Sequence, residues 1–70
     1  MKNIEYTEIT LARQKKSREQ YWTDHRNWKM HPVVRLTDMS ESGWELAGTY
    51  TTETESESRI SFILKLHVLL

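Results

Sequence analysis

The fold is decided by the last eleven residues, Ile60-Ser61-Phe62-Ile63-Leu64-Lys65-Leu66-His67-Val68-Leu69-Leu70. One set of alternate positions carries Ile, Phe, Leu, Leu, Val and Leu, and the other carries Ser, Ile, Lys, His and Leu. Strict alternation over this length predicts a β-strand with one buried face. Because the second set is itself partly apolar, we expect the outer face of this strand to be partly covered as well.

The segment before it, Trp44-Glu45-Leu46-Ala47-Gly48-Thr49-Tyr50-Thr51-Thr52, is rich in aromatic and β-branched residues and predicts a second strand. Its apolar face would carry Trp44, Leu46, Gly48 and Tyr50. A glycine inside a strand usually marks a bulge or a close approach, so we expect a bulge at Gly48 or a helix packed onto it. The stretch 51–58 contains no Gly, Asn or Pro, which predicts a hairpin whose strands extend into the connection.

A short helix is predicted over residues 32–42. Pro32 suits the first helical position, and Gly43 suits the left-handed residue just past the end. Val33, Leu36 and Met39 fall on one stripe at helical spacing. About three turns are implied, so packing against the rest of the chain must hold the helix in place.

The amino-terminal stretch 4–11 also alternates, but its apolar parity changes between Tyr6 and Ile9, which predicts a bulge near Thr7 and Glu8. Residues 12–31 are expected to form a helical or irregular insertion. Within it, residues 17–20 match a capping box that would open a helix running to about residue 29. Residues 21–23 also have strand character, so both alternatives stay open. The pattern as a whole predicts one α+β domain over residues 1–70, with a βαββ-like antiparallel sheet and one short helix.

The segment Gly43-Trp44-Glu45-Leu46, placed between the predicted helix and hairpin, resembles a motif of a family of very small bacterial and phage proteins known only as a domain of unknown function. In that family an aromatic-containing strand similar to Ile4-Glu5-Tyr6-Thr7 comes first. The resemblance covers residues 3–11 and 32–70, and residues 12–31 have no counterpart. It implies a βαββ fold and self-association, and it implies no reaction. The motif itself is expected to determine the fold: Gly43 would end the helix, Trp44 would pack back onto it, and Leu46 would point inward.

Several kinds of catalytic and metal site are excluded or unsupported by the composition. The chain has no cysteine, which excludes disulfides, thiolate nucleophiles and sulfur-ligated zinc. His25 and His31 are six residues apart and match no metal-ligand spacing. Two glycines are too few for a glycine-rich phosphate loop, and no serine nucleophile motif is present. We therefore expect no enzymatic activity, no metal and no cofactor.

The formal net charge of zero hides an asymmetry between the two halves of the chain. Residues 1–35 hold eight Lys or Arg against four Asp or Glu, and residues 36–70 hold two against six. Duplex DNA is not an expected partner, because modules that bind it carry a clear basic excess. No apolar run is long enough to span a membrane, and the amino-terminal residues lack the apolar core of a signal peptide. A cytoplasmic protein is expected, in the host cytoplasm if the chain is phage-encoded.

The segment 13–29 is the candidate ligand-binding region, because cations contact phosphates and exposed aromatic rings stack on bases. The candidate residues are Arg13, Lys15, Lys16, Arg18, Tyr21, Trp22, Arg26 and Trp28. The competing interpretation is a solvated charge run followed by aromatic residues that are needed in the core. A small nucleotide fits a chain without net charge better than duplex DNA does.

The last strand is the candidate oligomer interface, because an apolar strand at the edge of a sheet needs a partner. The competing interpretation is that the amino-terminal strand and the helix already cover both sides of it. The candidate interface residues are Ile63, Lys65, His67 and Leu69, with residues 43–52 and 59–70 near the interface. The leading hypothesis is a non-enzymatic binding module that forms a homo-oligomer and captures a host or cellular partner, for example as a small phage accessory protein acting against host defence. The alternative is a binder of nucleotides or single-stranded nucleic acid that uses residues 13–29.

Overall fold

A computed structural model describes residues 2–69 and shows a small α+β fold with one four-stranded antiparallel sheet and one helix. The elements follow one another as β1 (Lys2–Gln14), β2 (Gln20–Trp22), α1 (Pro32–Glu41), β3 (Glu45–Glu53) and β4 (Glu57–Leu69). The spatial order of the strands is β2-β1-β4-β3. The long strands β1 and β4 therefore form the centre of the sheet, and β2 and β3 are its edges.

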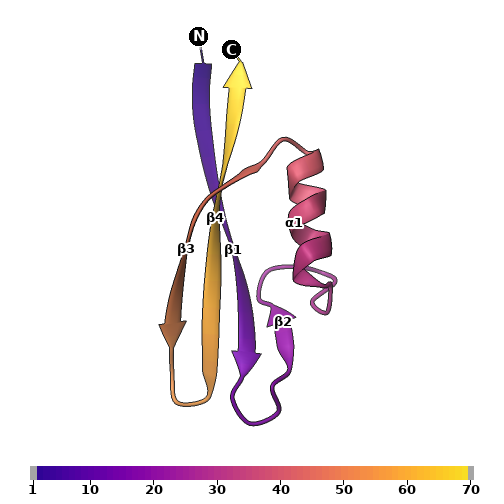
Figure 1. The fold of residues 1–70 in the computed structure, drawn as a ribbon, viewed down its shortest axis with the longest axis vertical. Coiled ribbons are helices and arrows are strands. Elements are labelled where there is room, and N and C mark those ends of the chain that lie inside the picture. Colours follow the sequence, from indigo (N-terminus) through magenta and orange to yellow (C-terminus); the bar gives the residue numbers. More distant parts are fainter. Residues whose placement is uncertain (1, 70) are drawn as a thin grey trace.

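The molecule is elongated, with principal extents of 48 × 21 × 16 Å. β1 and β4 pair over their whole length and wind around each other, so that they cross in Figure 1. This strong twist is typical of a two-stranded ribbon. At one end of the molecule the ribbon, made of the start of β1 and the end of β4, projects beyond α1 and β3 (Figure 1). At the other end the sheet is four strands wide and carries the two hairpin turns.

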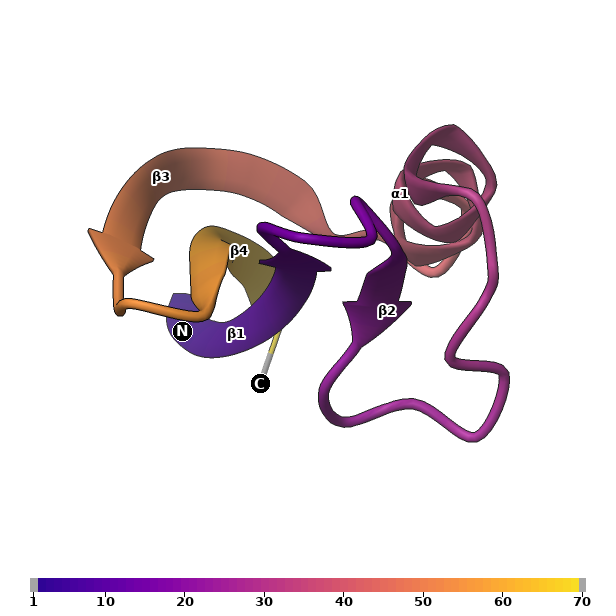
Figure 2. The same ribbon diagram turned by 90° about the horizontal axis from the view of Figure 1, so that it is seen from below.

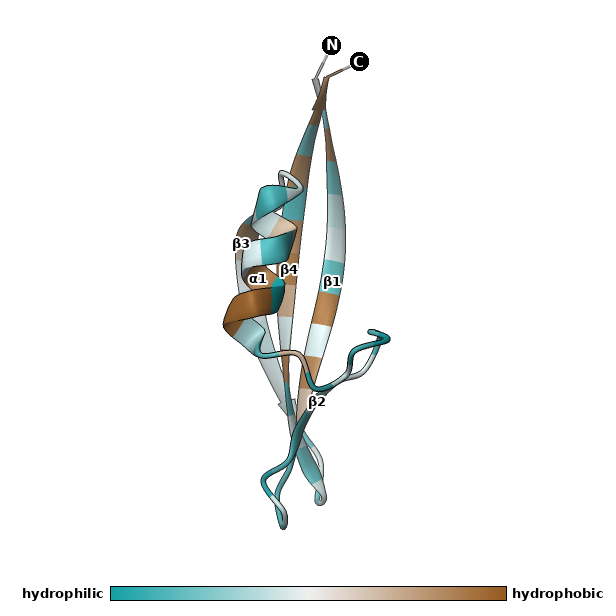
Figure 3. Ribbon diagram, turned by 90° about the vertical axis from the view of Figure 1, so that its right-hand side faces the viewer, coloured by the Kyte–Doolittle hydropathy of each residue, from teal (hydrophilic) through white to brown (hydrophobic). Residues whose placement is uncertain are grey.

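The core lies between α1 and one face of the sheet, which we call the inner face. Its buried apolar side chains come from β1, β2 and β4: Ile9, Leu11, Trp22 and Leu64. Half-buried side chains of the helix, the connecting segments and β4 pack against them: Met30, Leu36, Met39, Trp44, Ile60 and Phe62. The helix stands beside the β2 edge in both Figure 1 and Figure 2. Figure 3 shows brown apolar bands interspersed with teal and white ones along β1 and β4. Successive side chains of a strand point to opposite faces, and we call the face opposite the inner one the open face.

The predicted carboxy-terminal strand and its inner face are confirmed in β4, where Leu64 is buried and Phe62 packs on Trp22 with 6.0 Å between ring centroids. The expectation that this strand is an edge is wrong for most of its length. β4 pairs with β1 throughout and with β3 from Ser58 to Lys65. The reason is topological: the amino-terminal strand lies beside β4, on the side away from β3. Self-association stays a prediction.

The predicted bulge in the amino-terminal strand is wrong. The β1–β4 register is unbroken from Lys2 opposite Leu69 to Gln14 opposite Glu57. The apparent change of parity arises because Tyr6 points to the open face, where it is 64% exposed, while Ile9 points to the inner face and is buried. An exposed tyrosine, and not an extra residue, explains the pattern.

Of the helical or irregular insertion expected at residues 12–31, the helix is wrong, and residues 15–19 and 23–31 are irregular. The first residues of this stretch continue β1 to Gln14, and residues 20–22 form β2. The strand alternative is correct because Trp22 pairs opposite Leu11 and fills the core, which a helix from Ser17 would not allow. The order of elements along the chain is therefore ββαββ.

The predicted helix and its ends are confirmed to within one residue. Pro32 occupies the first turn, the His31 side chain accepts a hydrogen bond from the Val33 backbone N–H, and Gly43 has a positive φ of 93°. The backbone N–H of Trp44 donates to the Met39 carbonyl at 3.0 Å, so the Trp44 ring returns to the core as expected.

Three details of the predicted apolar faces are wrong. Tyr50 does not share a face with Leu46, because the register shift before Gly48 places it opposite Ser61 on the open face, where it is 44% exposed. Val33 is 64% exposed, because the buried side of the helix passes instead through Arg35. Leu46 is 55% exposed, at the start of the edge strand β3. The bulge at Gly48 is confirmed, with a register shift between Leu46 and Gly48. No helix packs onto Gly48, because a Cβ built there meets nothing within 4 Å.

The two glycines provide a matched pair of substitutions. In Gly43→Ala the alanine would have to adopt the left-handed backbone conformation of Gly43, and its Cβ would lie 3.1 Å from Leu66 Cδ1. We expect this change to lower the free energy of unfolding by about 1–2 kcal/mol. Gly48→Ala meets open space, and alanine is the better strand residue, so it should raise stability by up to about 1 kcal/mol. Urea unfolding measures both changes. Equal unfolding midpoints for the two variants would contradict the assignment of Gly43 to a left-handed helix end and of Gly48 to an open position in β3.

Candidate anion-binding groove

A tight connection between β1 and β2 carries three basic residues, Lys15, Lys16 and Arg18. The Gln14 backbone N–H donates to the Glu19 carbonyl at 2.8 Å, and the Arg18 N–H donates to the Gln14 carbonyl at 2.8 Å. Arg18 has a positive φ of 61°, the one such non-glycine residue within residues 2–69. A left-handed arginine costs about 1 kcal/mol or more, so this turn holds Arg18 in a conformation that arginine does not favour.

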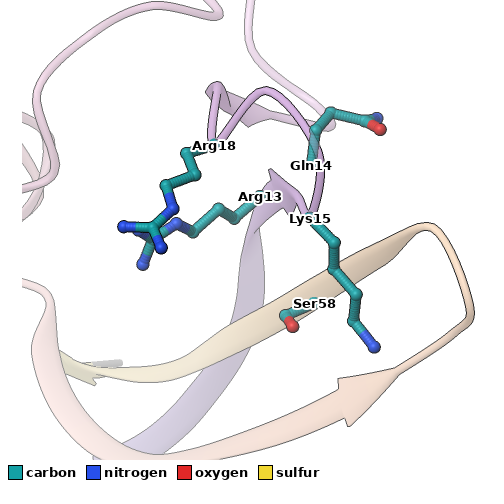
Figure 4. A pocket seen from close by; sticks show the side chains of 5 residues that line it. All are labelled: Arg13, Gln14, Lys15, Arg18 and Ser58. Carbon is teal, nitrogen blue, oxygen red and sulfur yellow. The ribbon is translucent and has the colours of Figure 1, made fainter.

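Two arginine side chains converge beside this turn. In Figure 4 the side chains of Arg13 and Arg18 extend toward the same side of the turn, the first from the end of β1 and the second from the turn itself. They line a hollow of about 310 Å³ together with Gln14, Lys15 and Ser58. Ser58 belongs to this hollow because β4 places it directly opposite Arg13. The pairing of strands thus brings residues from distant parts of the sequence to one basic site.

Neither guanidinium group has a carboxylate partner within residues 2–69. The cations of the described chain that form ion pairs are Lys15 with Glu53, Arg35 with Asp24 and Arg59 with Glu57. Two like charges held together without a counter-charge repel each other and attract an anion. Guanidinium groups are suited to oxyanions because their planar forks donate two parallel hydrogen bonds.

The hollow continues along the inner face of the sheet. A second hollow, of about 260 Å³, shares Arg13 and Ser58 with the first and is also lined by Leu11, Gln20, Thr51, Glu53, Arg59 and Ile60. A third, of about 340 Å³, shares Leu11 and Gln20 with the second and ends at Trp28, Lys29 and His31. Because neighbouring hollows share lining residues, we call the three together the basic groove, with Arg13 and Arg18 at one end and Trp28 at the other; Glu19 also lines the third hollow. Trp28 is 46% exposed, with Lys29 Nζ 4.8 Å from the centre of its ring.

Trp22 does not belong to the groove surface, although the sequence suggested it as a ligand contact. It is 2% exposed, and its indole N–H donates to the Met30 carbonyl at 2.7 Å. For this residue the competing interpretation, an aromatic side chain needed in the core, is correct.

Tyr21 lies on the open face of the sheet, away from the groove. Its hydroxyl donates to Glu57 Oε2 at 2.8 Å, and Arg59 holds the other carboxylate oxygen at 2.6 Å. The hydrogen bond from Tyr21, followed by that from Arg59, lowers the pKa of Glu57 below its usual 4.5, and the bond to Glu57 raises the pKa of Tyr21 above 10.0. These partners occupy the Tyr21 hydroxyl, so we do not assign it a ligand.

The remaining candidates are spread over other surfaces. Lys16 lies in the turn and lines a separate hollow with Glu55 and Ser56. Arg26 is exposed in the 23–31 segment and lines none of the three hollows of the groove. The candidate interface residues alternate along the open face of β4, and of these Leu69 is 80% exposed while Ile63 and Lys65 are half-buried.

No sequence pattern indicated the polar cluster formed by Arg35, Asp24 and Trp22. The Arg35 guanidinium is buried, donates to both Asp24 oxygens at 3.0 and 3.4 Å, and lies 4.4 Å from the centre of the Trp22 ring. It ties the irregular 23–31 segment to the helix. The groove residues Gln20 and Ser58 were missed as well, because only strand register places them beside Arg13.

Within residues 2–69 no three His, Cys, Asp or Glu side chains gather as they would around a metal ion. No helix in the same range is long and apolar enough to cross a membrane. Comparison of the chain with protein-family models, with curated proteins and with solved structures finds no match.

Proposed function

We propose that this chain is a non-enzymatic binding module whose basic groove holds a phosphorylated nucleoside ligand, either a free nucleotide or a short single strand. The observation that carries the proposal is the convergence of Arg13 and Arg18, without a carboxylate partner among the described residues, at one end of a groove. A backbone conformation that arginine disfavours holds one of the two in place, which points to a selected arrangement.

The two ends of the groove match the two parts of such a ligand. Phosphate oxygens accept paired hydrogen bonds from guanidinium groups, and bases stack on exposed aromatic rings. The arginine pair would hold the phosphate, and Trp28, with Lys29 beside it, would stack the base. The polar residue Gln20, which is shared by two of the hollows, lies between them and offers hydrogen bonds to the sugar.

Binding of the ligand is tested with fluorescein-labelled single-stranded oligothymidylate and, separately, with ATP, by fluorescence anisotropy and tryptophan quenching. In the double variant Arg13→Gln/Arg18→Gln we expect a loss of affinity of about tenfold or more, because charge-assisted hydrogen bonds contribute about 1.5–3 kcal/mol each. Trp28→Ala should weaken binding by a comparable factor, since stacking of a base is worth about 1–3 kcal/mol.

The matched control is Lys16→Gln/Arg26→Gln, which removes the same charge from outside the groove. It should change the affinity less than about threefold. Only the arginine variant should make the affinity less dependent on salt. For the single strand, the slope of log affinity against log salt concentration should fall by about 0.7 for each phosphate that the protein no longer neutralises. Binding of ATP alone would identify a nucleotide site, and binding of the oligomer alone would identify a strand site. Equal losses in both double variants, or no binding of either probe, would overturn the proposal.

The resemblance to small bacterial and phage proteins supports a wider proposal that rests on Gly43–Leu46 and the βαββ pattern alone. In this wider proposal the chain is an accessory protein that self-associates and captures a cellular partner. The nucleotide proposed above would then be that partner.

A further inference from the structure

The end of the molecule opposite the basic groove is a two-stranded ribbon without a covering layer. It consists of the first residues of β1 and the last residues of β4, beyond the reach of β3 and α1 (Figure 1). A two-stranded ribbon is marginally stable in water by itself. It nevertheless exposes large apolar side chains on its open face, at Ile4, Tyr6 and Leu69. A further strand beside it would cover part of this surface.

The outer edge of β1 is free over this ribbon. Backbone hydrogen bonds show which residues of β1 turn toward each neighbour. The Gln14 N–H donates to the Glu19 carbonyl and the Thr10 carbonyl accepts from the Thr23 N–H, both on the β2 side, whereas the Lys15 N–H donates to the Ser56 carbonyl on the β4 side. Because backbone groups alternate along an antiparallel strand, the even-numbered residues of β1 face outward. β2 covers this edge from Thr10 onward. The outward backbone groups of Ile4, Tyr6 and Glu8 have no neighbouring strand among the described residues, and Figure 3 shows this part of β1 on the side away from α1.

We propose that a second copy of this chain pairs with this edge, β1 against β1, antiparallel and centred on Tyr6. In this register Ile4 lies opposite Glu8 of the second copy, and Tyr6 lies opposite Tyr6. All three free positions are then hydrogen-bonded pairs, each of which exchanges two backbone bonds. The inference is independent of the proposed ligand, because it uses the opposite end of the molecule.

Charge and space select this register over its neighbours. Moving the centre to residue 5 sets Glu5 directly opposite Glu5, which is destabilising. Moving it to residue 7 sets Ile4 opposite Thr10, where Thr23 already occupies the edge. Centred on Tyr6, Glu5 faces Thr7, and the Glu8 carboxylate that faces Ile4 already accepts a hydrogen bond from the Tyr50 hydroxyl. The two Tyr6 rings form a cross-strand aromatic pair beside the Ile4 side chains.

Other free edges suit a second copy less well. On the β4 side of the ribbon only His67 and Leu69 turn their backbone groups outward, because β3 covers the strand below them. On the outer edge of β3 the backbone groups of Thr49, Thr51 and Glu53 turn outward, and none of these three side chains is apolar. On the free edge of β1, by contrast, two of the three outward residues, Ile4 and Tyr6, are exposed and apolar.

The dimer has a defined shape that follows from the register. Its twofold axis passes between the Tyr6 residues, and the two chains continue one sheet in opposite directions. Seven residues of strand separate Tyr6 from Arg13, which is roughly 24 Å, so the two arginine pairs lie roughly 50 Å apart. Pairing over a few residues buries less than the roughly 800 Å² per partner of a stable complex, so we expect association that depends on concentration.

Cysteine cross-linking tests the register on a background without native cysteine. In a hydrogen-bonded pair the Cα atoms are about 5.5 Å apart, within the range of a disulfide. Tyr6→Cys should therefore form a covalent dimer on oxidation. Ile4→Cys alone should not, because its counterpart is displaced by four residues, whereas a mixture of Ile4→Cys and Glu8→Cys chains should cross-link as a heterodimer. Cross-linking of Ile4→Cys alone, or of no pair, overturns the register.

Native mass spectrometry and sedimentation test the association without cross-links. Tyr6→Lys places like charges opposite each other and should leave a monomer, as should Tyr6→Glu, while an equimolar mixture of the two should recover a heterodimer. This recovery separates loss of pairing from loss of folding. Thr49→Lys, on the β3 edge, should still dimerise. A monomeric parent chain at every concentration, or a dimer that Thr49→Lys disrupts and Tyr6→Lys does not, contradicts the proposal.

Discussion

Replacing Trp22 with alanine should unfold most of the protein or move its urea midpoint close to zero. Trp22 is the largest fully buried side chain among the described residues, and it contacts Phe62, Arg35 and the Met30 carbonyl at once. Removing a buried tryptophan costs about 3–5 kcal/mol. A domain of this size is stable by about 4–10 kcal/mol in total, so the substitution removes a large share of that stability.

The control for this substitution is Trp28→Ala, which removes the same side chain from a site that is 46% exposed. It should shift the free energy of unfolding by less than about 1 kcal/mol. Both variants are measured by circular dichroism in urea, because tryptophan fluorescence would itself change. If Trp28→Ala were as damaging as Trp22→Ala, the assignment of Trp22 to the core and Trp28 to the groove surface would be wrong.

Replacing Arg35 with methionine should release the 23–31 segment and lower the free energy of unfolding by about 2 kcal/mol. The change keeps the apolar stem of the side chain and removes both hydrogen bonds to Asp24 and the cation above the Trp22 ring. Charge-assisted hydrogen bonds contribute about 1.5–3 kcal/mol when partly buried, and a desolvated cation–π contact contributes up to about 2 kcal/mol. The exposed Asp24 carboxylate regains water, which offsets part of the loss.

Limited digestion with trypsin measures the release of the segment directly, because Arg26 and Lys29 lie within it. Cleavage there should be faster in Arg35→Met than in the parent chain. Arg35→Lys should be intermediate, since an ammonium group cannot donate to both carboxylate oxygens in the same planar arrangement. Thr37→Val, on the exposed side of the same helix, should leave the cleavage rate near that of the parent. An unchanged rate in Arg35→Met would show that other contacts hold the segment.

The elements with a clear period could be predicted from the sequence. The alternation of residues 60–69 determined a strand with one buried face, and Pro32 and Gly43 determined both ends of the helix, because these signals are local and backbone-driven. The bulge at Gly48 followed from a glycine inside a strand in the same way. The basic character of residues 13–18 was also visible in the sequence.

Only the tertiary structure decided how these parts meet. Residues 20–22 have no strong period, and they become a strand because Trp22 fills the core opposite Leu11. Arg35 is buried because Asp24 and Trp22 surround it, and Arg13 joins Arg18 and Ser58 in one hollow because a hairpin and a strand register bring them together. Contacts between residues far apart in sequence depend on register and packing, and a local pattern carries no information about either. The sequence by itself thus determined where the long strands and the helix form, whereas the pairing of β1 with both β2 and β4 created the groove and left one edge free.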